Sequence, residues 1–292
     1  MYVIAGVTGH TGKAAAEALL AIKEDVRVIV RDGKQGETWK QQGAEVAVAS
    51  LGDAAALAPA LAGAKGAYLL VPPRYDAEDM LAAQRAMVEA MAQAVRKSGV
   101  PHVVLLSSAG AELADGTGPI KGLHHFEAAM TKAGKNFTTI RAGYFIENFA
   151  PVLPATQGGV LPTFLAPGHA APMTATADVG RVVAEALLDP ASGSRMIELG
   201  VPGGCTPEDV ARDLSAILGR TITVQAGPLD AVVPAFTSMG FPKGTAELVR
   251  EMIGALNSGR IRHQGPPALR RFGQLRPGDV LRGLLAGAPS VA

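Results

Sequence analysis

Cysteine, net charge and long apolar runs are all scarce in this chain of 292 residues. The single cysteine, Cys205, cannot form an internal disulfide or a metal site built from several thiolates. Lys and Arg number 27 and Asp and Glu 26, so the net charge of +1 makes a nucleic-acid binder unlikely. No uncharged apolar window reaches the roughly 18 residues of a membrane-spanning helix, and the N-terminus lacks the pattern of a signal peptide. We therefore expect a cytoplasmic protein with no membrane segment.

Short apolar runs and helical patterns alternate along the first half of the chain. Six runs are expected to be strands, at residues 2–6, 26–30, 44–49, 64–71, 102–107 and 137–141. Helical patterns separate these runs, and the longest, at 77–98, has Gly99 as its expected cap. Such an alternation predicts the α/β class, with a Rossmann-type doubly wound parallel sheet.

The first expected strand leads into a glycine-rich turn, GVTGHTG at residues 6–12, which opens an alanine-rich helix. A dinucleotide pyrophosphate needs a backbone that it can approach closely and the free N–H groups of a helix N-terminus. We expect Gly6 to supply the tight turn, Gly9 the close approach and Gly12 the room for the helix against the strand. A P-loop is excluded, because five residues separate the outer glycines and alanine follows Lys13.

The end of the second expected strand bears on the choice of cofactor. An acid at this place hydrogen-bonds the ribose 2′-hydroxyl of NAD, whereas an arginine meets the 2′-phosphate of NADP. Arg31 comes first after the strand, and Lys34 lies close enough to add a second cation. Asp32, which lies between them, is an acid of the kind that binds the ribose of NAD(H). The sequence therefore favours NADP(H), with NAD(H) as the alternative.

Several motifs carry a family resemblance. GxTGxTG, VRVIVRD, VPP, VVLLSSAG and RAGYFIENF occur in this order, and with them the chain resembles the NmrA-like branch of the atypical short-chain dehydrogenase/reductases. The similarity runs essentially end to end, and it is greatest to the bacterial NAD(P)H-dependent quinone reductases and the triphenylmethane dye reductases. The resemblance implies hydride transfer from NAD(P)H to a quinone-like or other planar electrophilic acceptor, which would be a small apolar molecule.

The resemblance also implies a set of cofactor contacts. Relatives commonly carry an aspartate after the third strand for the adenine amine; Ser50 stands at the matching position here, with Asp53 three residues later. Val71 and Pro72 are implied beside the nicotinamide ribose, and Ser107 and Ser108 near the nicotinamide. The remaining implied contacts are Gly6, Thr8, Gly9, His10, Thr11, Gly12 and Arg31.

The catalytic pair of ordinary short-chain dehydrogenases, a tyrosine with a lysine four residues later, is missing. The tyrosines stand at 2, 68, 75 and 144, and none has that lysine. Hydride transfer to a quinone or a delocalised cation gives a stabilised product, so positioning can suffice. The candidate catalytic residues are Ser108 at the end of the fifth strand, His124 at the head of the next helix and Tyr144 after the sixth strand. No metal site is predicted, because His169 has no partner at ligand spacing.

The later part of the chain is expected to complete the core and to cover the substrate. We assign residues 1–152, completed by 174–200, to the NAD(P)-binding core, 153–173 to a substrate-side loop, and 201–292 to a smaller substrate-side α/β region. Asp178 is expected to cap a helix. Phe164, Met173 and Phe241 are candidates for an apolar acceptor pocket, with ordinary core packing as the alternative. Residues 258–292 carry six arginines and one acid, Asp279.

Two functions from different classes remain. The first is an NAD(P)H-dependent reductase of a planar acceptor, which the similarity to reductases along the C-terminal part favours. The second is a non-catalytic sensor that binds NADP(H) and reports redox state to a protein partner, which the missing pair and the basic C-terminal segment favour. A homodimer is compatible with either function.

Overall fold

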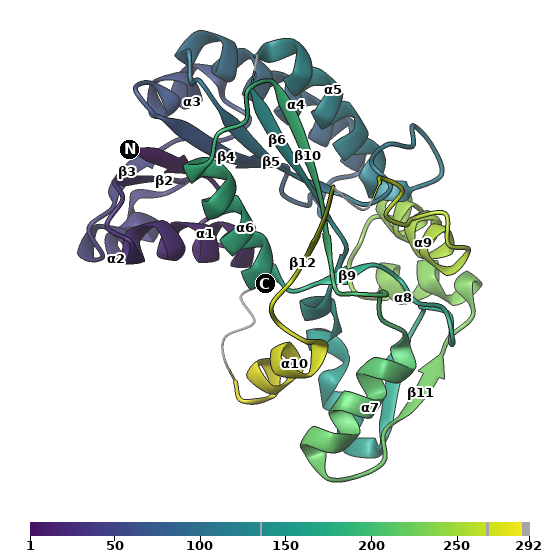
Figure 1. The fold of residues 1–292 in the computed structure, drawn as a ribbon. Helices are drawn as coiled ribbons and strands as arrows, with labels where there is room; N and C mark the ends of the chain where they lie inside the picture. The colour runs from purple at the N-terminus through teal and green to yellow at the C-terminus, as the bar shows by residue number, and fades with distance from the viewer. Residues whose placement is uncertain (135, 267–268, 288–292) are drawn as a thin grey trace.

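The centre of the molecule is an eight-stranded parallel sheet. A computed structural model describes residues 1–134, 136–266 and 269–287. The strand order is β12-β10-β6-β5-β4-β1-β2-β3 (Figure 1), which confirms the predicted α/β class and Rossmann-type sheet. Its strands are β1 (Tyr2–Ile4), β2 (Val26–Val30), β3 (Glu45–Val48), β4 (Gly66–Leu70), β5 (Val103–Ser108), β6 (Phe137–Ala142), β10 (Ser194–Gly200) and β12 (Arg270–Phe272).

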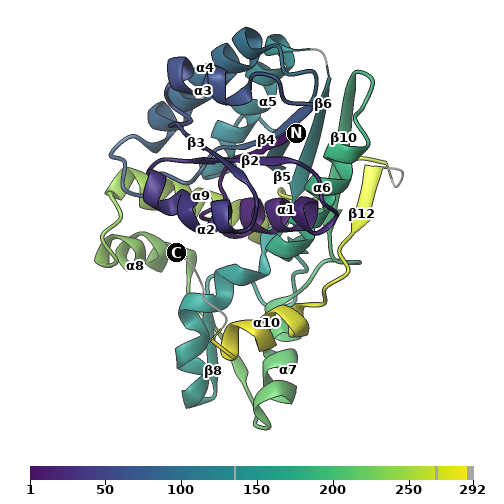
Figure 2. The same cartoon turned by 90° about the vertical axis from the view of Figure 1, so that its left-hand side faces the viewer.

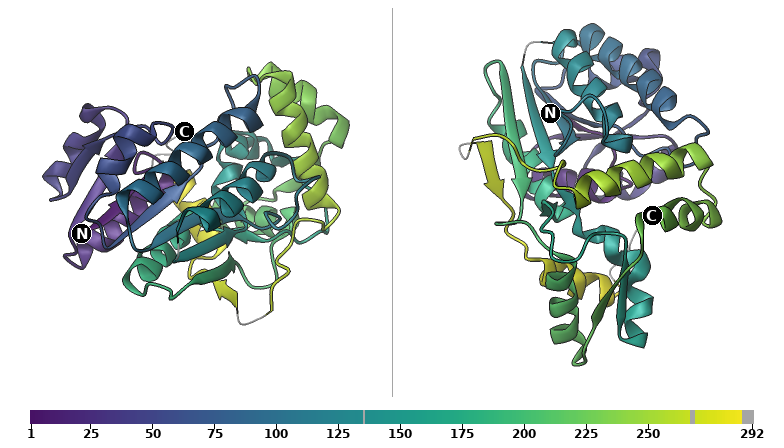
Figure 3. Two further views of the ribbon diagram at one scale, coloured as in Figure 1. Left: turned by 90° about the horizontal axis from the view of Figure 1, so that it is seen from above. Right: turned by 90° about the vertical axis from the view of Figure 1, so that its right-hand side faces the viewer.

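Helices cover both faces of this sheet (Figures 2 and 3). One face packs against α1, α2 and α6, and the other against α3, α4 and α5. Neighbouring residues such as Val3 and Ile4 therefore both have no exposed surface, which is why the strands read as unbroken apolar runs. The helices are α1 (His10–Ala21), α2 (Glu37–Gln41), α3 (Ala54–Leu61), α4 (Met80–Ser98), α5 (Lys121–Ala133) and α6 (Thr176–Leu188), with short 3-10 turns η1 (Gly33–Gly36) and η2 (Gly118–Ile120).

Local sequence signals set several helix ends. The Asp79 carboxylate accepts the Ala82 N–H at the start of α4, and Gly99 ends that helix with φ of 67°. A capping box of Thr206 and Asp209 opens α7 (Pro207–Leu218). Gly99 was expected to cap its helix, and that prediction is confirmed.

The prediction that Asp178 caps a helix is wrong. Helix α6 begins at Thr176 after Ala175, and Asp178 lies inside its first turn with 2% of its surface exposed. Its two carboxylate oxygens accept the backbone N–H groups of Gln274 and Leu275 at 2.9 and 3.0 Å. A buried carboxylate requires such donors, so Asp178 fastens the C-terminal segment to the core.

The segment predicted to be a loop at 153–173 contains regular structure. Residues Ile146–Gly158 form the 3-10 helix η3, and β8 (Val160–Thr163) pairs in parallel with β11 (Thr223–Ala226). Strand β7 (Tyr144–Phe145) pairs with β9 (Met173–Thr174). Prolines lie within η3 and β8. Because proline cannot donate a backbone hydrogen bond, it is uncommon inside helices and strands, and the sequence therefore resembles a loop here.

The C-terminal elements lie beyond one end of the strands of the sheet, and the chain then returns to the sheet with β12 (Figure 1). After α7 come η4 (Leu229–Ala231), α8 (Val232–Ser238) and α9 (Lys243–Asn257). The chain then adds β12 beside β10, and the last helix of the described ranges is α10 (Pro277–Leu285), which packs on α7 and η3. None of the helices in the described ranges is long and apolar enough to cross a bilayer.

The basic C-terminal segment is tied into this structure. Arg271 pairs with Glu185 at 3.3 Å, Arg282 pairs with Asp279 at 3.4 Å, and Arg260 donates to the Asp115 carbonyl oxygen at 2.9 Å. These three arginines thus form ion pairs or hydrogen bonds with other residues of the chain.

Candidate functional site

The sheet reverses its direction of winding between β1 and β4, which are neighbours in space. Loops on either side of such a switch point leave in opposite directions and open a crevice at the carboxyl ends of the strands, where α/β proteins bind ligands. The glycine-rich turn follows β1 there, and Val71 and Pro72 follow β4. Both of these residues are partly exposed.

The glycine turn has the geometry that the sequence predicts. Gly6 adopts φ of +70°, and the Gly9 N–H donates to the Gly6 carbonyl oxygen at 3.0 Å. A Cβ atom at Gly12 would lie 2.4 Å from the Ala5 carbonyl oxygen, so only glycine lets α1 sit this close to β1. At Gly9 a Cβ atom would meet only the Gly6 oxygen, at 3.6 Å. Gly12 is therefore required by packing, whereas Gly9 leaves open space.

The N-terminus of α1 is directed at this open space without a side-chain cap. Gly9 is the N-cap residue and has no side chain that could cap the helix, and the first turn carries no acid. Thr11 is buried, and its hydroxyl oxygen accepts a hydrogen bond from the Tyr68 hydroxyl at 2.9 Å. The Thr11 side chain thus belongs to the core, and its predicted role at the site is confined to its backbone N–H.

The residues after β2 and β3 differ in their freedom to bind a ligand. Arg31 is exposed and makes no ion pair with any residue in the described part of the chain. Asp32 accepts the Lys34 N–H at 3.0 Å and caps η1. The Ser50 hydroxyl accepts the Gly52 N–H at 3.2 Å, and Asp53 caps α3 through the Ala55 and Ala56 N–H groups. Among the described residues, the side-chain charges of Arg31 and Lys34 are thus without a partner.

A buried polar network lies behind the carboxyl ends of β5 and β6. The Ser107 hydroxyl donates to Glu127 Oε1 at 2.5 Å, and Arg141 binds both Glu127 oxygens at 2.9 and 2.7 Å. Arg141 also pairs with Glu112 at 3.1 Å. With 3% of its surface exposed, Ser107 has its hydroxyl committed to Glu127. No sequence pattern predicts this pairing, because Glu127 comes from α5, 20 residues after Ser107.

Ser108 and His124 are better placed to meet a ligand. Ser108 is partly exposed, and its hydroxyl donates to the Ala109 carbonyl oxygen at 2.9 Å. His124 Nδ1 lies 2.9 Å from the Ala111 carbonyl oxygen, so this nitrogen carries the proton and donates it. In the neutral ring Nε2 is then an acceptor. The adjacent His125 instead pairs with Glu89 at 2.8 Å.

Tyr144 stands at the carboxyl end of β6, in contact with other aromatic rings. Its ring centroid is 6.3 Å from that of Phe149 in an edge-on arrangement. Loss of solvation raises the pKa of the Tyr144 phenol to about 12, with the charge of Tyr75 adding to the shift and a hydrogen bond with Asn148 opposing it. Tyr144 is therefore a neutral hydrogen-bonding group over the physiological pH range.

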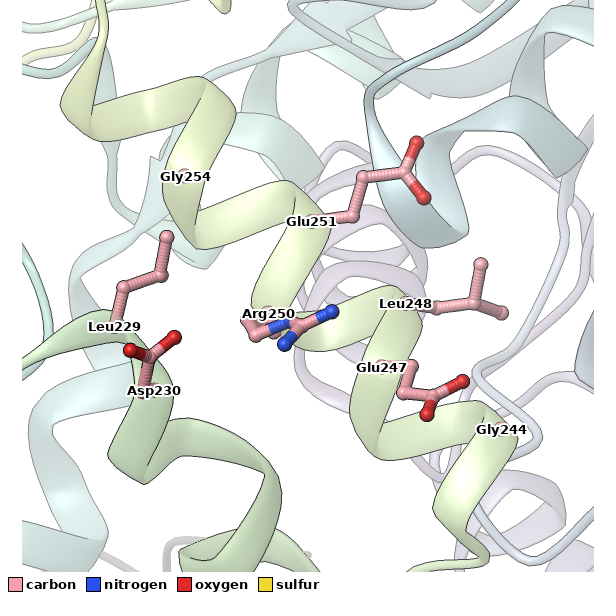
Figure 4. A pocket seen from close by; sticks show the side chains of 8 residues that line it. All are labelled: Leu229, Asp230, Gly244, Glu247, Leu248, Arg250, Glu251 and Gly254. Atoms are coloured by element: carbon pink, nitrogen blue, oxygen red, sulfur yellow. The ribbon is translucent and has the colours of Figure 1, made fainter.

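The helix α9 joins the loops that follow β4 and β5. The Thr245 hydroxyl donates to the Ala77 carbonyl oxygen at 3.0 Å, and Glu251 pairs with Lys121 at 3.0 Å. Lys121 is thus held in an ion pair with Glu251. No tyrosine stands four residues before it, as one does in ordinary short-chain dehydrogenases. On its other flank α9 borders a shallow cavity of about 560 Å³ (Figure 4), lined by Leu229, Asp230, Gly244, Glu247, Leu248, Arg250, Glu251 and Gly254. None of the predicted cofactor or catalytic residues lines it.

The three candidates for an apolar acceptor pocket have different surroundings. Met173 is fully buried in the core of the C-terminal elements. Phe164 packs beside Val232 and Phe236. Phe241 stacks on Tyr75 with ring centroids 5.1 Å apart, so of the three it is Phe241 that reaches the loop after β4.

Comparison with known proteins agrees with this architecture. The model of the NmrA-like family matches residues 2–261. The NAD(P)H azoreductase of Xenophilus azovorans is 24% identical over all of this chain and 92% of its own length, and quinone oxidoreductase 2 of Escherichia coli K12 is 26% identical over 89% of each chain. The triphenylmethane reductase of Citrobacter sp., solved with NADP(H), superposes with a TM-score of 0.82 at 20% identity, covering 99% of this chain and all of that one.

Proposed function

The chain belongs to the NmrA-like family, and from this membership we propose that it is an NADPH-dependent oxidoreductase that transfers hydride to a flat electrophilic acceptor. The observation that carries the proposal is the N-terminus of α1, which has a glycine as its N-cap residue and no acid in its first turn, behind a turn that packing restricts to glycine at residue 12. The names of the similar proteins support the acceptor class, because quinones, azo dyes and triphenylmethane dyes are all flat conjugated molecules.

The residues present fit NADP(H). The open space at Gly9 and the first turn of α1 suit a pyrophosphate. Arg31 has no partner among the described residues and can meet a 2′-phosphate with Lys34 beside it, whereas one oxygen of Asp32 is already occupied in capping η1. Val71 and Pro72 follow β4, Ser108 ends β5, and these residues are proposed to contact the nicotinamide half. Adenine is held by packing around Ser50, since Asp53 is engaged in capping α3.

The protein contributes chiefly positioning. NADPH supplies a hydride from its nicotinamide C4 when it is bound. A quinone that gains one hydride and one proton becomes a hydroquinone, so one proton must come from solvent or from a nearby side chain. Ser108, His124 and Tyr144 are the polar groups proposed to orient the acceptor. Among them His124, with Nδ1 committed to Ala111, can present Nε2.

A second candidate, a non-catalytic NADP(H) sensor, is favoured by one observation. Lys121 is bound by Glu251 and the Ser107 hydroxyl by Glu127, so the groups nearest to the usual catalytic positions are already engaged. The sensor function would act through a protein partner. The arginines of the C-terminal segment bind parts of this chain, which weakens the case for that segment as the partner site.

Acceptor-dependent oxidation of NADPH separates the two functions. Purified protein is mixed with NADPH and a panel of quinones, azo dyes and triphenylmethane dyes, and the absorbance of the reduced nicotinamide is followed. We expect oxidation to depend on the acceptor and to be faster with NADPH than with NADH. Tight NADPH binding without acceptor-dependent oxidation would instead establish the sensor.

A further inference from the structure

Aromatic side chains are scarce in this protein, and five of them contact another aromatic ring. The chain has eight Phe, four Tyr and one Trp. Within the described ranges, rings contact one another in three pairs: Tyr75 with Phe241, Phe236 with Phe241, and Tyr144 with Phe149. All of these residues lie in segments that follow the carboxyl ends of β4 or β6 or belong to the C-terminal elements. Because α/β proteins bind ligands at the carboxyl ends of their strands, these ring contacts point to a role in binding a ligand.

The two contacts that Phe241 makes link the core to the C-terminal elements. Tyr75 lies between β4 and α4, three residues after Pro72, whereas Phe236 belongs to α8 and Phe241 to the turn between α8 and α9. The Tyr75 and Phe241 ring centroids are 5.1 Å apart with the planes tilted by 42°. Phe236 meets Phe241 at the same centroid distance with perpendicular planes. We call Tyr75, Phe236 and Phe241 the aromatic platform.

Neighbouring contacts hold the segments that carry Tyr75 and Phe236 in place. The Thr245 hydroxyl binds the Ala77 carbonyl oxygen, two residues after Tyr75. Phe236 packs against the buried cluster of Val232, Val249 and Ile253. Tyr75 nevertheless has 45% of its surface exposed. A large ring that is anchored at its neighbours but keeps exposed surface is suited to contact a ligand.

We propose that the aromatic platform selects fused-ring acceptors over single-ring acceptors by stacking against the part of the molecule farthest from the reacting carbonyl. The proposal rests on the proposed reductase function and specifies its acceptor. Tyr75 follows Pro72 near the switch point, and ionisation of its phenol would raise the pKa of Tyr144, which follows β6. A flat acceptor held near the nicotinamide would extend past Tyr144 toward Tyr75 only if it has more than one ring.

Offset and edge-on ring contacts explain the selectivity. Aromatic pairs contribute about 0.5–1.5 kcal/mol beyond the area that they bury, which corresponds to a change of about 2- to 12-fold in affinity. The platform therefore favours the larger acceptor by about this factor. It has no effect on hydride transfer itself, so kcat at saturation is expected to stay nearly unchanged.

A matched pair of acceptors tests the platform. Methyl-naphthoquinone and methyl-benzoquinone differ by one fused ring, and KM and kcat are measured for both with NADPH. In Tyr75→Leu and Phe241→Leu we expect KM for the naphthoquinone to rise by about 2- to 12-fold, with KM for the benzoquinone changed much less. Met239→Ala is the control, because Met239 lies in the same turn with 61% of its surface exposed and outside the ring contacts.

A binding measurement separates failure of the platform from failure of the reductase function. Dissociation constants of both quinones are determined by calorimetry for the wild type, Tyr75→Leu and Met239→Ala, each loaded with NADP⁺. Weaker naphthoquinone binding in Tyr75→Leu alone supports the platform even if no acceptor is reduced. Equal affinities in the three proteins, or equal losses for the two quinones, would overturn it whatever the turnover.

Discussion

At the scale of single residues, we propose that Arg31 determines the preference for NADPH over NADH. Its guanidinium is exposed and unpaired within the described chain, at the place where a 2′-phosphate would lie. Hydrogen bonds to charged groups contribute about 1.5–3 kcal/mol, so Arg31→Ala should weaken NADPH binding by about ten- to a hundredfold and leave NADH binding within about threefold. Calorimetric titration measures both constants. Lys34→Ala is the control and should have a smaller effect; equal losses for NADPH and NADH in Arg31→Ala would refute the assignment.

The buried phenol of Tyr68 predicts a loss of stability at alkaline pH. Burial raises its pKa well above the usual 10.0, although the hydrogen bond with Thr11 opposes the shift. Between the unfolded and folded pKa values the unfolded state releases the proton and the folded state keeps it. The free energy of unfolding should therefore fall above about pH 10, by up to about 1.4 kcal/mol per pH unit for this group. Urea unfolding from pH 8 to 11 should show a shallower alkaline decline in Tyr68→Phe; parallel declines would exclude Tyr68 as the cause.

Residues whose role depends on local backbone geometry could be predicted from the sequence, and those that meet a distant segment could not. Gly6, Gly9 and Gly12 follow a strand and open a helix, and that local pattern determines what each must do. Ser107 was expected near the nicotinamide, but its hydroxyl is bound to Glu127, which lies 20 residues later. Asp178 resembles a helix cap and instead binds backbone groups 96 and 97 residues away. No short-range pattern contains such information.

At the scale of elements, the start of α1 separates a packing requirement from a binding requirement. Gly12→Ala would place a Cβ atom 2.4 Å from the Ala5 carbonyl oxygen, and overpacking of this kind costs about 1–3 kcal/mol. Gly9→Ala meets only one atom, at 3.6 Å. We expect Gly12→Ala to lower the melting temperature, and Gly9→Ala to keep it while weakening NADPH binding about tenfold or more, since its methyl group occupies the space of the pyrophosphate. An unchanged NADPH affinity in Gly9→Ala would place the pyrophosphate elsewhere.

The C-terminal segment is an element whose attachment depends on buried carboxylates. Glu198 accepts the Gln264 and Gly265 N–H groups at 2.9 and 2.8 Å, as Asp178 does for residues 274 and 275. Removing the Asp178 carboxylate leaves two backbone donors without partners, at a cost of about 1–3 kcal/mol each.

Limited trypsin digestion tests this attachment. Asp178→Ala should be cut after Arg270 or Arg271 at least about tenfold faster than the wild type, because the segment opens more often. Asp189→Ala is the matched control, since Asp189 is exposed and forms a surface pair with Arg195. Equal cleavage rates in Asp178→Ala and the wild type would contradict the role of Asp178.

Most strands and helices of the core could be predicted because each lies in an apolar run or a helical pattern of the sequence. Strand β7 has two residues, β9 two and β12 three, and no period can be read from such lengths. These strands form because the neighbouring backbone is already in place. The same dependence explains why the ordered segment from η3 to β8, with its prolines, was expected to be a loop.

At the scale of the whole molecule, the parallel sheet and the C-terminal elements contribute different residues to the proposed site. The sheet brings the glycine turn, Arg31, Val71 and Ser108 to the same edge. Helix α9 then joins the loops after β4 and β5, and the platform that includes Tyr75 lies where the two parts meet. The fold and the cofactor turn could be read from the sequence, whereas this meeting of distant segments required the structure.

The central claim is that this protein moves a hydride from NADPH to an acceptor, and isotopic labelling tests it most directly. NADPH carrying deuterium on one face or the other of nicotinamide C4 is oxidised by the protein with methyl-naphthoquinone, and the NADP⁺ formed is analysed by mass spectrometry. Because a fixed site presents one face of the ring to the acceptor, we expect one labelled form to lose its deuterium completely and the other to retain it. Loss from both forms alike, or no oxidation that depends on the quinone, would contradict the account.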